Sequence, residues 1–240
     1  MTKSLSAAEH EAEVETRFDL LNSRFKREVP PDDIRLDAIR RVIEPFGSCR
    51  ILDLGCGKGR FAARLAEDGA NVVGLDLSTA MLAEAVDLDR VRASARRLPF
   101  ADEAFDVVAA IELFEHLHGI DDAIVEARRV LRPGGLLAVI DKNAGSLNAK
   151  RPWLPNLAVK WLDTKRGRWM YPDKGPVRER WFWPKVFARR LMVAGFEDVR
   201  IAYPLRPEES RSSLFQRYPG ARLLTLWTAR SPAPTRGEHT

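Results

Sequence analysis

Three glycines spaced two residues apart, Gly55, Gly57 and Gly59, give the strongest chemical signal in this 240-residue sequence. Glycine lets a backbone turn tightly and approach a ligand where a Cβ would collide. The apolar run at 51–54 predicts a buried strand, and the residues after Gly59 predict a helix whose N-terminal N–H groups favour a negative group. A loop at the carboxyl end of a strand is where open α/β sheets bind ligands.

Two carboxylates accompany this loop and narrow the choice of ligand. Asp53 precedes the glycines, where it suits a cationic amino group and repels a pyrophosphate. Asp76 ends a second predicted strand, 71–76, and can accept hydrogen bonds from two ribose hydroxyls. Arg60 stands where a dinucleotide fingerprint requires glycine or alanine, and Arg60-Phe61 replaces the Lys-Ser/Thr of a phosphate-binding loop. The pattern therefore favours a nucleoside joined to an amino acid.

The run Asp-Leu-Gly-Cys-Gly-Lys-Gly at 53–59 resembles the first motif of class I S-adenosylmethionine (AdoMet)-dependent methyltransferases. Residues 76–81 resemble the second motif, and 112–135 resemble the ubiquinone/menaquinone-biosynthesis and general small-molecule branch. The resemblance covers roughly residues 50–141 and implies AdoMet as the cofactor. It implies cofactor contacts from Asp53, Gly55, Cys56, Gly57, Gly59, Asp76, Leu77, Met81, Ser94, Ala95 and Ile111.

Two of these positions have a second interpretation or depart from the family. Periodicity alone makes Met81 a core residue, whereas the resemblance places it beside the adenine. Ser94 stands where an aspartate of the family meets the adenine. A hydroxyl can still bond the adenine amino group, but more weakly than a carboxylate.

The expected fold is α/β: a Rossmann-like, seven-stranded, mostly parallel sheet with helices on both faces and an antiparallel edge hairpin. The expected strands are 51–54, 71–76, 90–93, 105–111, 136–140, 196–203 and 221–229. We expect one methyltransferase domain over 1–240, with helices in 1–47 (the first over about 7–26) that cover the cofactor pocket or shield the sheet. Residues 204–220 are expected to form a loop, and the Pro-rich end, 231–240, a disordered tail.

Methyl transfer is an in-line displacement at a sulfonium, so it needs mainly alignment and desolvation. His116 follows the fourth predicted strand and is the best general-base candidate; its alternative is a helix-capping or packing role. Glu112 can reach cofactor or substrate, and Glu115 can orient His116 or cap the next helix. In quinone O-methyltransferases a similar Glu-x-x-Glu-His run is implicated in binding a divalent cation. We predict no metal here.

Residues 143–183 are an insertion expected to lie over the substrate side as a lid. Between 142 and 200 there are 14 basic and 5 acidic residues, and five of the six tryptophans lie in the insertion. Tryptophan with lysine and arginine suits an amphipathic acceptor or a membrane surface, and stacking on single-stranded nucleic acid uses the same residues. Equally, the tryptophans can pack inward while the charges face water.

Composition limits the remaining choices. A formal charge of +5 is only mildly basic. Cys49 and Cys56 bracket one predicted strand, so we expect no disulfide and a cytoplasmic protein. We predict methyl transfer to a small-molecule or lipid-like acceptor, with the atom unresolved. The alternatives are a nucleic-acid methyltransferase, disfavoured because 111–114 lacks an Asn/Asp-Pro-Pro-aromatic run, and a non-catalytic AdoMet-binding module.

Overall fold

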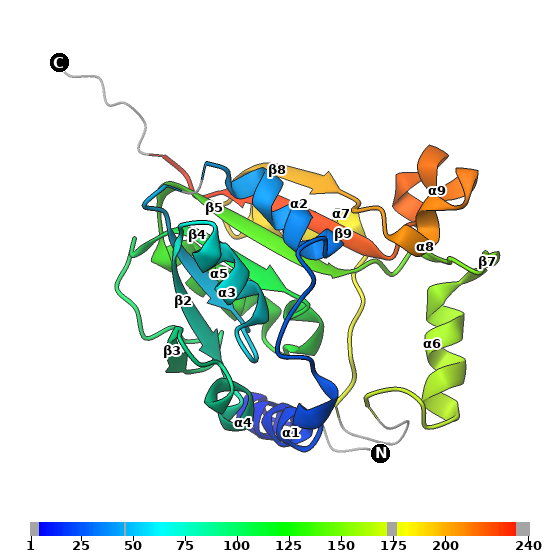
Figure 1. The fold of residues 1–240 in the computed structure, drawn as a ribbon, viewed down its shortest axis with the longest axis horizontal. Helices are drawn as coiled ribbons and strands as arrows, with labels where there is room; N and C mark the ends of the chain where they lie inside the picture. The colour runs from blue at the N-terminus through cyan, green and yellow to red at the C-terminus, as the bar shows by residue number, and fades with distance from the viewer. Residues whose placement is uncertain (1–4, 46, 172–176, 234–240) are drawn as a thin grey trace.

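The computed structural model describes residues 5–45, 47–171 and 177–233. Its centre is a seven-stranded sheet in the order β3-β2-β1-β4-β5-β9-β8 (Figure 1). The strands are β1 (Arg50–Leu54), β2 (Asn71–Asp76), β3 (Asp89–Arg92), β4 (Phe105–Ile111), β5 (Leu131–Lys142), β8 (Glu197–Ala202) and β9 (Leu224–Arg230). β1 to β5 run parallel, and β9 runs antiparallel to both β5 and β8. The predicted fold class is confirmed.

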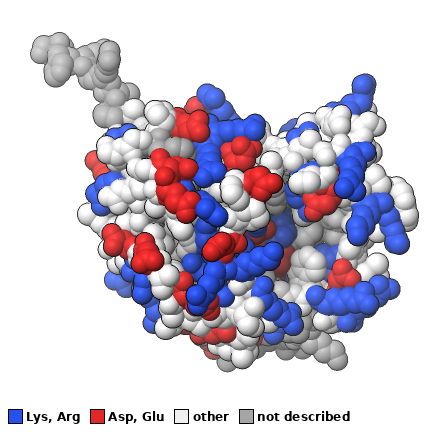
Figure 2. Space-filling model, in the orientation of Figure 1, with Lys and Arg blue, Asp and Glu red and all other residues white. Residues whose placement is uncertain are grey.

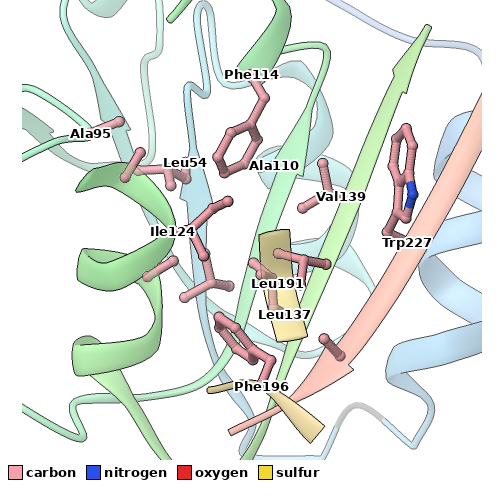
Figure 3. Packing of buried hydrophobic residues seen from close by; sticks show 14 of the residues in the cluster. Leu54, Ala95, Ala110, Phe114, Ile124, Leu137, Val139, Leu191, Phe196 and Trp227 are labelled. Carbon is pink, nitrogen blue, oxygen red and sulfur yellow. The ribbon is translucent and has the colours of Figure 1, made fainter. Parts of the chain in front are cut away.

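Alternation along the strands sends side chains to two cores, one on each face of the sheet. Leu52 and Leu54 of β1 join the core covered by α5 (Ile120–Val130) and α7 (Pro184–Val193). Ile51, which precedes Leu52, points to the opposite face and joins the core covered by α2 (Ile34–Ile43) and α3 (Arg60–Glu67). Figure 3 shows the first core, where Leu191 of α7 lies beside Leu137 of β5. This packing fixes where each strand ends and hence where the site lies.

The first helix, α1 (Ala7–Leu20), is shorter than predicted. A capping box between Ser6 and Glu9 starts it, and the short helix η1 (Asn22–Arg24) then turns the chain. The apolar pattern continues to Phe25, but that ring stacks on Phe18 at a centroid distance of 5.5 Å, which a continuous helix would not allow. α1 lies beside α4 (Thr79–Ala83) (Figure 1). None of the residues of α1 is buried.

The insertion has two parts that the sequence did not distinguish. A small hairpin, β6 (Leu147–Asn148) and β7 (Arg151–Pro155), leads to α6 (Asn156–Lys165), which stands away from the sheet (Figure 1). Residues 177–183 then return to the sheet, where the Phe182 N–H donates to the Lys142 carbonyl at 3.0 Å. The second part therefore lies against the end of β5.

Residues 204–220, expected as a loop, instead contain α8 (Pro207–Ser210), α9 (Ser213–Arg217) and the turn η3 (Pro219–Ala221). Within the described ranges, no helix is long and apolar enough to cross a membrane. Most of the tail expected at 231–240 lies outside the described residues.

Candidate functional site

The carboxyl ends of four parallel strands surround one cavity. Gly55 follows β1, Asp76 ends β2, Glu112 follows β4 and Lys142 ends β5, and all four line the cavity. α1 and the neighbouring segment add a wall from the other side. That wall is formed by His10, Glu11, Val14, Glu15, Phe18, Phe25 and Lys26.

Nearly all the residues singled out from the sequence meet in this cavity. The lining contains Gly55, Cys56, Gly57, Asp76, Leu77, Met81, Ser94, Ala95, Ile111, Glu112 and His116. Asp53, near the end of β1, and Gly59, the last glycine of the loop, are not part of the lining. The cofactor contacts predicted for these two residues remain predictions.

The glycine loop has the backbone geometry that the spacing predicts. Gly55, Gly57 and Gly59 all have positive φ, 79°, 54° and 74°, where L side chains are disfavoured. A Cβ on Gly55 would also lie 2.7 Å from Cδ1 of Leu113. A Cβ on Gly57 would meet no atom within 4 Å, so that glycine faces open space. The bare backbone at Gly57 is therefore available to a ligand.

Asp76 joins the loop to the second strand. Its carboxylate accepts from the Gly57 N–H and the Ser78 N–H, each at 2.8 Å. Burial raises the pKa of Asp76, and the two N–H donors lower it in part. Ser78 caps α4 through the Met81 N–H, which orients Leu77 and Met81 into the cavity. The arrangement fits a diol at Asp76 with a planar group beyond it.

Asp53 is buried beneath the loop on β1. The register pairs it with Gly74, and Asp76 lies two residues further along β2, so both carboxylates are on one face of the sheet. Oδ2 of Asp53 has no hydrogen-bond partner among the described residues. Burial raises the pKa of Asp53 to about 7, and the charge of Asp76 adds to the shift.

Glu112 turns the chain out of β4 in a conformation unusual for a residue with a side chain, with φ at 55°. Its Oε2 lies 2.6 Å from Nη1 of Arg35, and its Oε1 lies 3.7 Å from Nζ of Lys142. Burial alone would raise the pKa of Glu112, but these cations outweigh burial and lower it. Glu112 is therefore ionised at neutral pH and held by two cations.

Lys142 binds three carboxylates at this end of the cavity. Its Nζ lies 2.5 Å from Oε1 of Glu115 and 3.6 Å from Oε1 of Glu179. Although burial opposes the charge, these carboxylates raise the pKa of Lys142, so it stays protonated. Glu115 is 1% exposed, and its Oε2 has no hydrogen-bond partner among the described residues. Burial and the neighbouring carboxylates raise the pKa of Glu115 to about 8.

His116 lies between Tyr171 and Glu115. Its Nδ1 is 2.9 Å from the Tyr171 hydroxyl, and its Nε2 is 3.4 Å from Oε1 of Glu115. Burial and the charge of Lys142 lower the pKa of His116 to about 4, so the ring is neutral at pH 7. Its carbonyl also contacts Nε2 of His10 at 3.1 Å. The ring therefore has a fixed orientation, and the general-base role remains a prediction.

Several cavity residues escaped the sequence reasoning. Lys142 could have been found, because it lies just beyond the predicted parallel strand 136–140. Glu11 and Glu15 come from a helix with no motif. Tyr171 and Glu179 do not line the cavity but contact the lining residues His116 and Lys142; they come from the insertion and carried no positional signal.

The carboxylates near His116 do not form a metal site in this arrangement. In the described part of the chain, no group of three or more His, Cys, Asp or Glu residues is placed to hold a metal ion. Glu112 and Glu115 turn instead toward Lys142. The absence of a metal here stays a prediction.

Comparisons with known proteins agree with the geometry. A methyltransferase-domain family model matches residues 52–139. The chain is 40% identical over 152 residues to demethylmenaquinone methyltransferase of Beutenbergia cavernae, covering 60% of this chain and 58% of that protein. It is 35% identical over 187 residues to ubiquinone biosynthesis O-methyltransferase of Agrobacterium fabrum, covering 69% and 71%.

A solved structure shares the fold at low sequence identity. Haemonchus contortus phosphoethanolamine N-methyltransferase 2, in complex with S-adenosyl-L-methionine, superposes with a TM-score of 0.64 and 18% identity. The match covers 92% of this chain and 57% of that one.

Proposed function

The chain belongs to the class I AdoMet-dependent methyltransferases, and on this premise we propose that it transfers the AdoMet methyl group to a small-molecule acceptor. One observation carries the proposal. A single cavity is lined at one end by the glycine loop and Asp76, and at the other by Glu112, His116 and Lys142. A cofactor at the first end would present its methyl group toward the second.

The residues present fit AdoMet. The open space at Gly57 would let its amino-acid part lie close to the loop backbone, and Asp76 would accept from its ribose hydroxyls. Leu77, Met81 and Ala95 would flank the adenine. Asp53, buried with an unpaired oxygen, would face the cationic amino group through the loop. When bound, AdoMet supplies an electrophilic methyl group on a sulfonium.

The protein contributes mainly position and exclusion of water. The cavity wall opposite the sheet is apolar in part, since Val14, Phe18, Phe25 and Met170 line it. The Arg17 Nε–H donates to the Met170 carbonyl at 2.7 Å, which joins α1 to the insertion. Aligning the reactants in a dry site accelerates a displacement that needs little other help.

His116 and Glu112 are the residues proposed to act on the acceptor. A neutral imidazole can take a proton from an acceptor hydroxyl or amine at Nε2, the nitrogen that lies 3.4 Å from Oε1 of Glu115. Glu112, ionised and held by Arg35, would orient the acceptor. A carbon acceptor would lie beside the same two residues. The proposal therefore does not specify whether oxygen, nitrogen or carbon receives the methyl group.

We propose a lipid-like acceptor and a peripheral membrane contact for the insertion. By their names, one of the two relatives is a demethylmenaquinone methyltransferase and the other is a ubiquinone biosynthesis O-methyltransferase. Trp153 and Trp161 are 76% and 61% exposed, on the hairpin and α6. Lys and Arg side chains are prominent over this part of the surface (right in Figure 2). Exposed tryptophan beside basic residues suits an anionic bilayer surface.

The alternatives are less well supported. Two of the insertion-side lysines, Lys142 and Lys160, are committed to Glu179 inside the site, so they do not offer charge to nucleic acid. A non-catalytic AdoMet-binding module would bind cofactor without turnover. The cytoplasmic location stays a prediction.

The test is metabolite profiling with methyl-labelled AdoMet, comparing the protein with Asp76→Ala. The wild type should label one or a few small molecules. The variant should lose cofactor affinity by about 1–3 kcal/mol, because ribose hydroxyls lose their partner. Asp89→Asn, an exposed carboxylate on β3, is the matched control and should label normally. Cofactor binding without any labelled product would support the non-catalytic alternative.

A further inference from the structure

We propose that Glu11 of α1 recognises the exocyclic amino group of the adenine, so that a carboxylate from the helix replaces the one absent at Ser94. This inference rests on the proposed function and adds a specificity-determining residue to it. The adenosine end is marked by Asp76, Leu77 and Ser94, and Glu11 lines the same cavity.

The contact between Glu11 and Ser94 carries the argument. The Ser94 hydroxyl donates to Oε1 of Glu11 at 2.6 Å and accepts from the Arg96 N–H at 3.1 Å. A hydroxyl has one hydrogen, and here that hydrogen points at a carboxylate 83 residues earlier in the chain. Ser94 thus fixes Glu11 at the edge of the position where the adenine is expected.

Glu11 is positioned to contact a ligand. Its side chain is 22% exposed, and Arg96 is the cation nearest to it, at 3.5 Å from Oε1. Both contacts use Oε1. Oε2 accepts no hydrogen bond from any residue that the structure describes, so it is available to a donor in the cavity.

The rest of α1 explains how a carboxylate is held there without a hydrophobic anchor. Asp19 accepts from the Ser78 hydroxyl at 2.5 Å, and Glu15 pairs with Arg92 at 2.7 Å. No residue of α1 is buried. The helix is therefore attached along the adenosine end by carboxylates, and Glu11 is the one that reaches Ser94.

The chemistry predicts a choice between nucleobases. Adenine presents an amino donor at its 6 position, which a carboxylate accepts as a charge-assisted hydrogen bond. Hypoxanthine presents a carbonyl oxygen there, which a carboxylate repels. A role limited to attaching the helix predicts no such choice.

The experiment is calorimetric binding of S-adenosylhomocysteine and S-inosylhomocysteine to the full chain. We expect the wild type to prefer the adenine compound and Glu11→Gln to reduce that preference about 10-fold, the usual effect of losing a charged hydrogen bond. Asp19→Asn, which weakens the attachment of α1 to Ser78 without changing a residue of the cavity lining, should leave the preference unchanged. Adding Ser94→Asp to Glu11→Gln should restore it.

The outcomes separate the two proposals. An unchanged preference in Glu11→Gln overturns the role of Glu11, whatever the affinity. Equal loss of preference in Asp19→Asn also overturns it, because the effect would then belong to helix attachment. Failure of the wild type to bind S-adenosylhomocysteine would instead contradict the proposed function.

Discussion

The hydroxyl of Tyr171 lies 2.9 Å from Nδ1 of His116, a residue 55 positions earlier. Burial raises the pKa of Tyr171, so the hydroxyl keeps its proton, and its oxygen can accept a hydrogen bond from Nδ1–H of the ring, which leaves the lone pair on Nε2. That hydrogen bond would fix the tautomer and place the ring's other nitrogen toward Glu115. The insertion thus supplies the group that orients the proposed base.

Tyr171→Phe removes this contact while keeping the ring. We expect kcat to fall about 10-fold or more for a hydroxyl or amine acceptor, since general-base catalysis contributes about 10²–10⁴-fold and depends on orientation. Cofactor affinity should not change. Steady-state kinetics with calorimetry measures both, and Tyr218→Phe, an exposed tyrosine, is the control. An unchanged kcat would assign His116 a packing role.

Asp53 offers a test through proton release. Because burial raises its pKa to about 7, Asp53 is partly protonated at pH 7. A cationic amino group nearby favours the ionised form, so cofactor binding should release roughly half a proton at pH 7. Calorimetry of S-adenosylhomocysteine in buffers of different ionisation enthalpy measures this release. Asp53→Asn should abolish it; equal release from both proteins would contradict the contact.

Glu115 should make the protein less stable as pH rises. Its folded pKa of about 8 lies above 4.5, the ordinary pKa of a glutamate, so between these two pH values the folded state holds a proton that the unfolded state has lost. Its contribution is therefore present below about pH 4.5 and is lost between pH 4.5 and 8. Urea unfolding of Glu115→Gln should show a flatter decline over this range than the wild type. Glu67→Gln, on the surface, should decline as the wild type does; an equal decline in Glu115→Gln would place the titration elsewhere.

The exposed tryptophans predict lipid selectivity. The wild type should sediment with vesicles that contain phosphatidylglycerol and not with pure phosphatidylcholine vesicles, because basic residues accompany the tryptophans. The double change Trp153→Ser and Trp161→Ser should reduce this binding several-fold and leave cofactor affinity intact. Val125→Ser removes an exposed apolar side chain from α5 and should bind normally. Equal binding to both vesicle types would contradict the proposed membrane contact.

Local patterns predicted the parts of the fold that depend on neighbouring residues. The strands follow from apolar runs, and the loop from glycines at positive φ. The end of α1 could not be predicted from the apolar pattern. Phe25 keeps the helical spacing, but the chain turns back there and stacks the Phe25 ring on Phe18. Pro207 and Ser213 begin short helices in a segment too brief for a periodic signal.

Cavity residues were predictable where they lie at the carboxyl end of a predicted strand, as Asp76 and Glu112 do. Cavity contacts were not predictable where they come from a segment that is distant in sequence and is brought to the site by tertiary packing. Glu11 reaches the cavity from α1, and Tyr171 reaches His116 from the insertion; neither has a motif. Arg35 neutralises Glu112 across 77 positions. Such pairings depend on the assembled sheet, which brings together residues that no short window contains.

Since α1 forms one wall of the cavity, any group fused to the chain ahead of Ser6 is attached directly to that wall. The opposite holds at β9, where Arg230 pairs with Leu136 near the amino end of β5, away from the chemistry. An affinity tag, a fluorophore or a fused partner domain placed after β9 would leave cofactor exchange undisturbed. The same addition before α1 would change what enters and leaves.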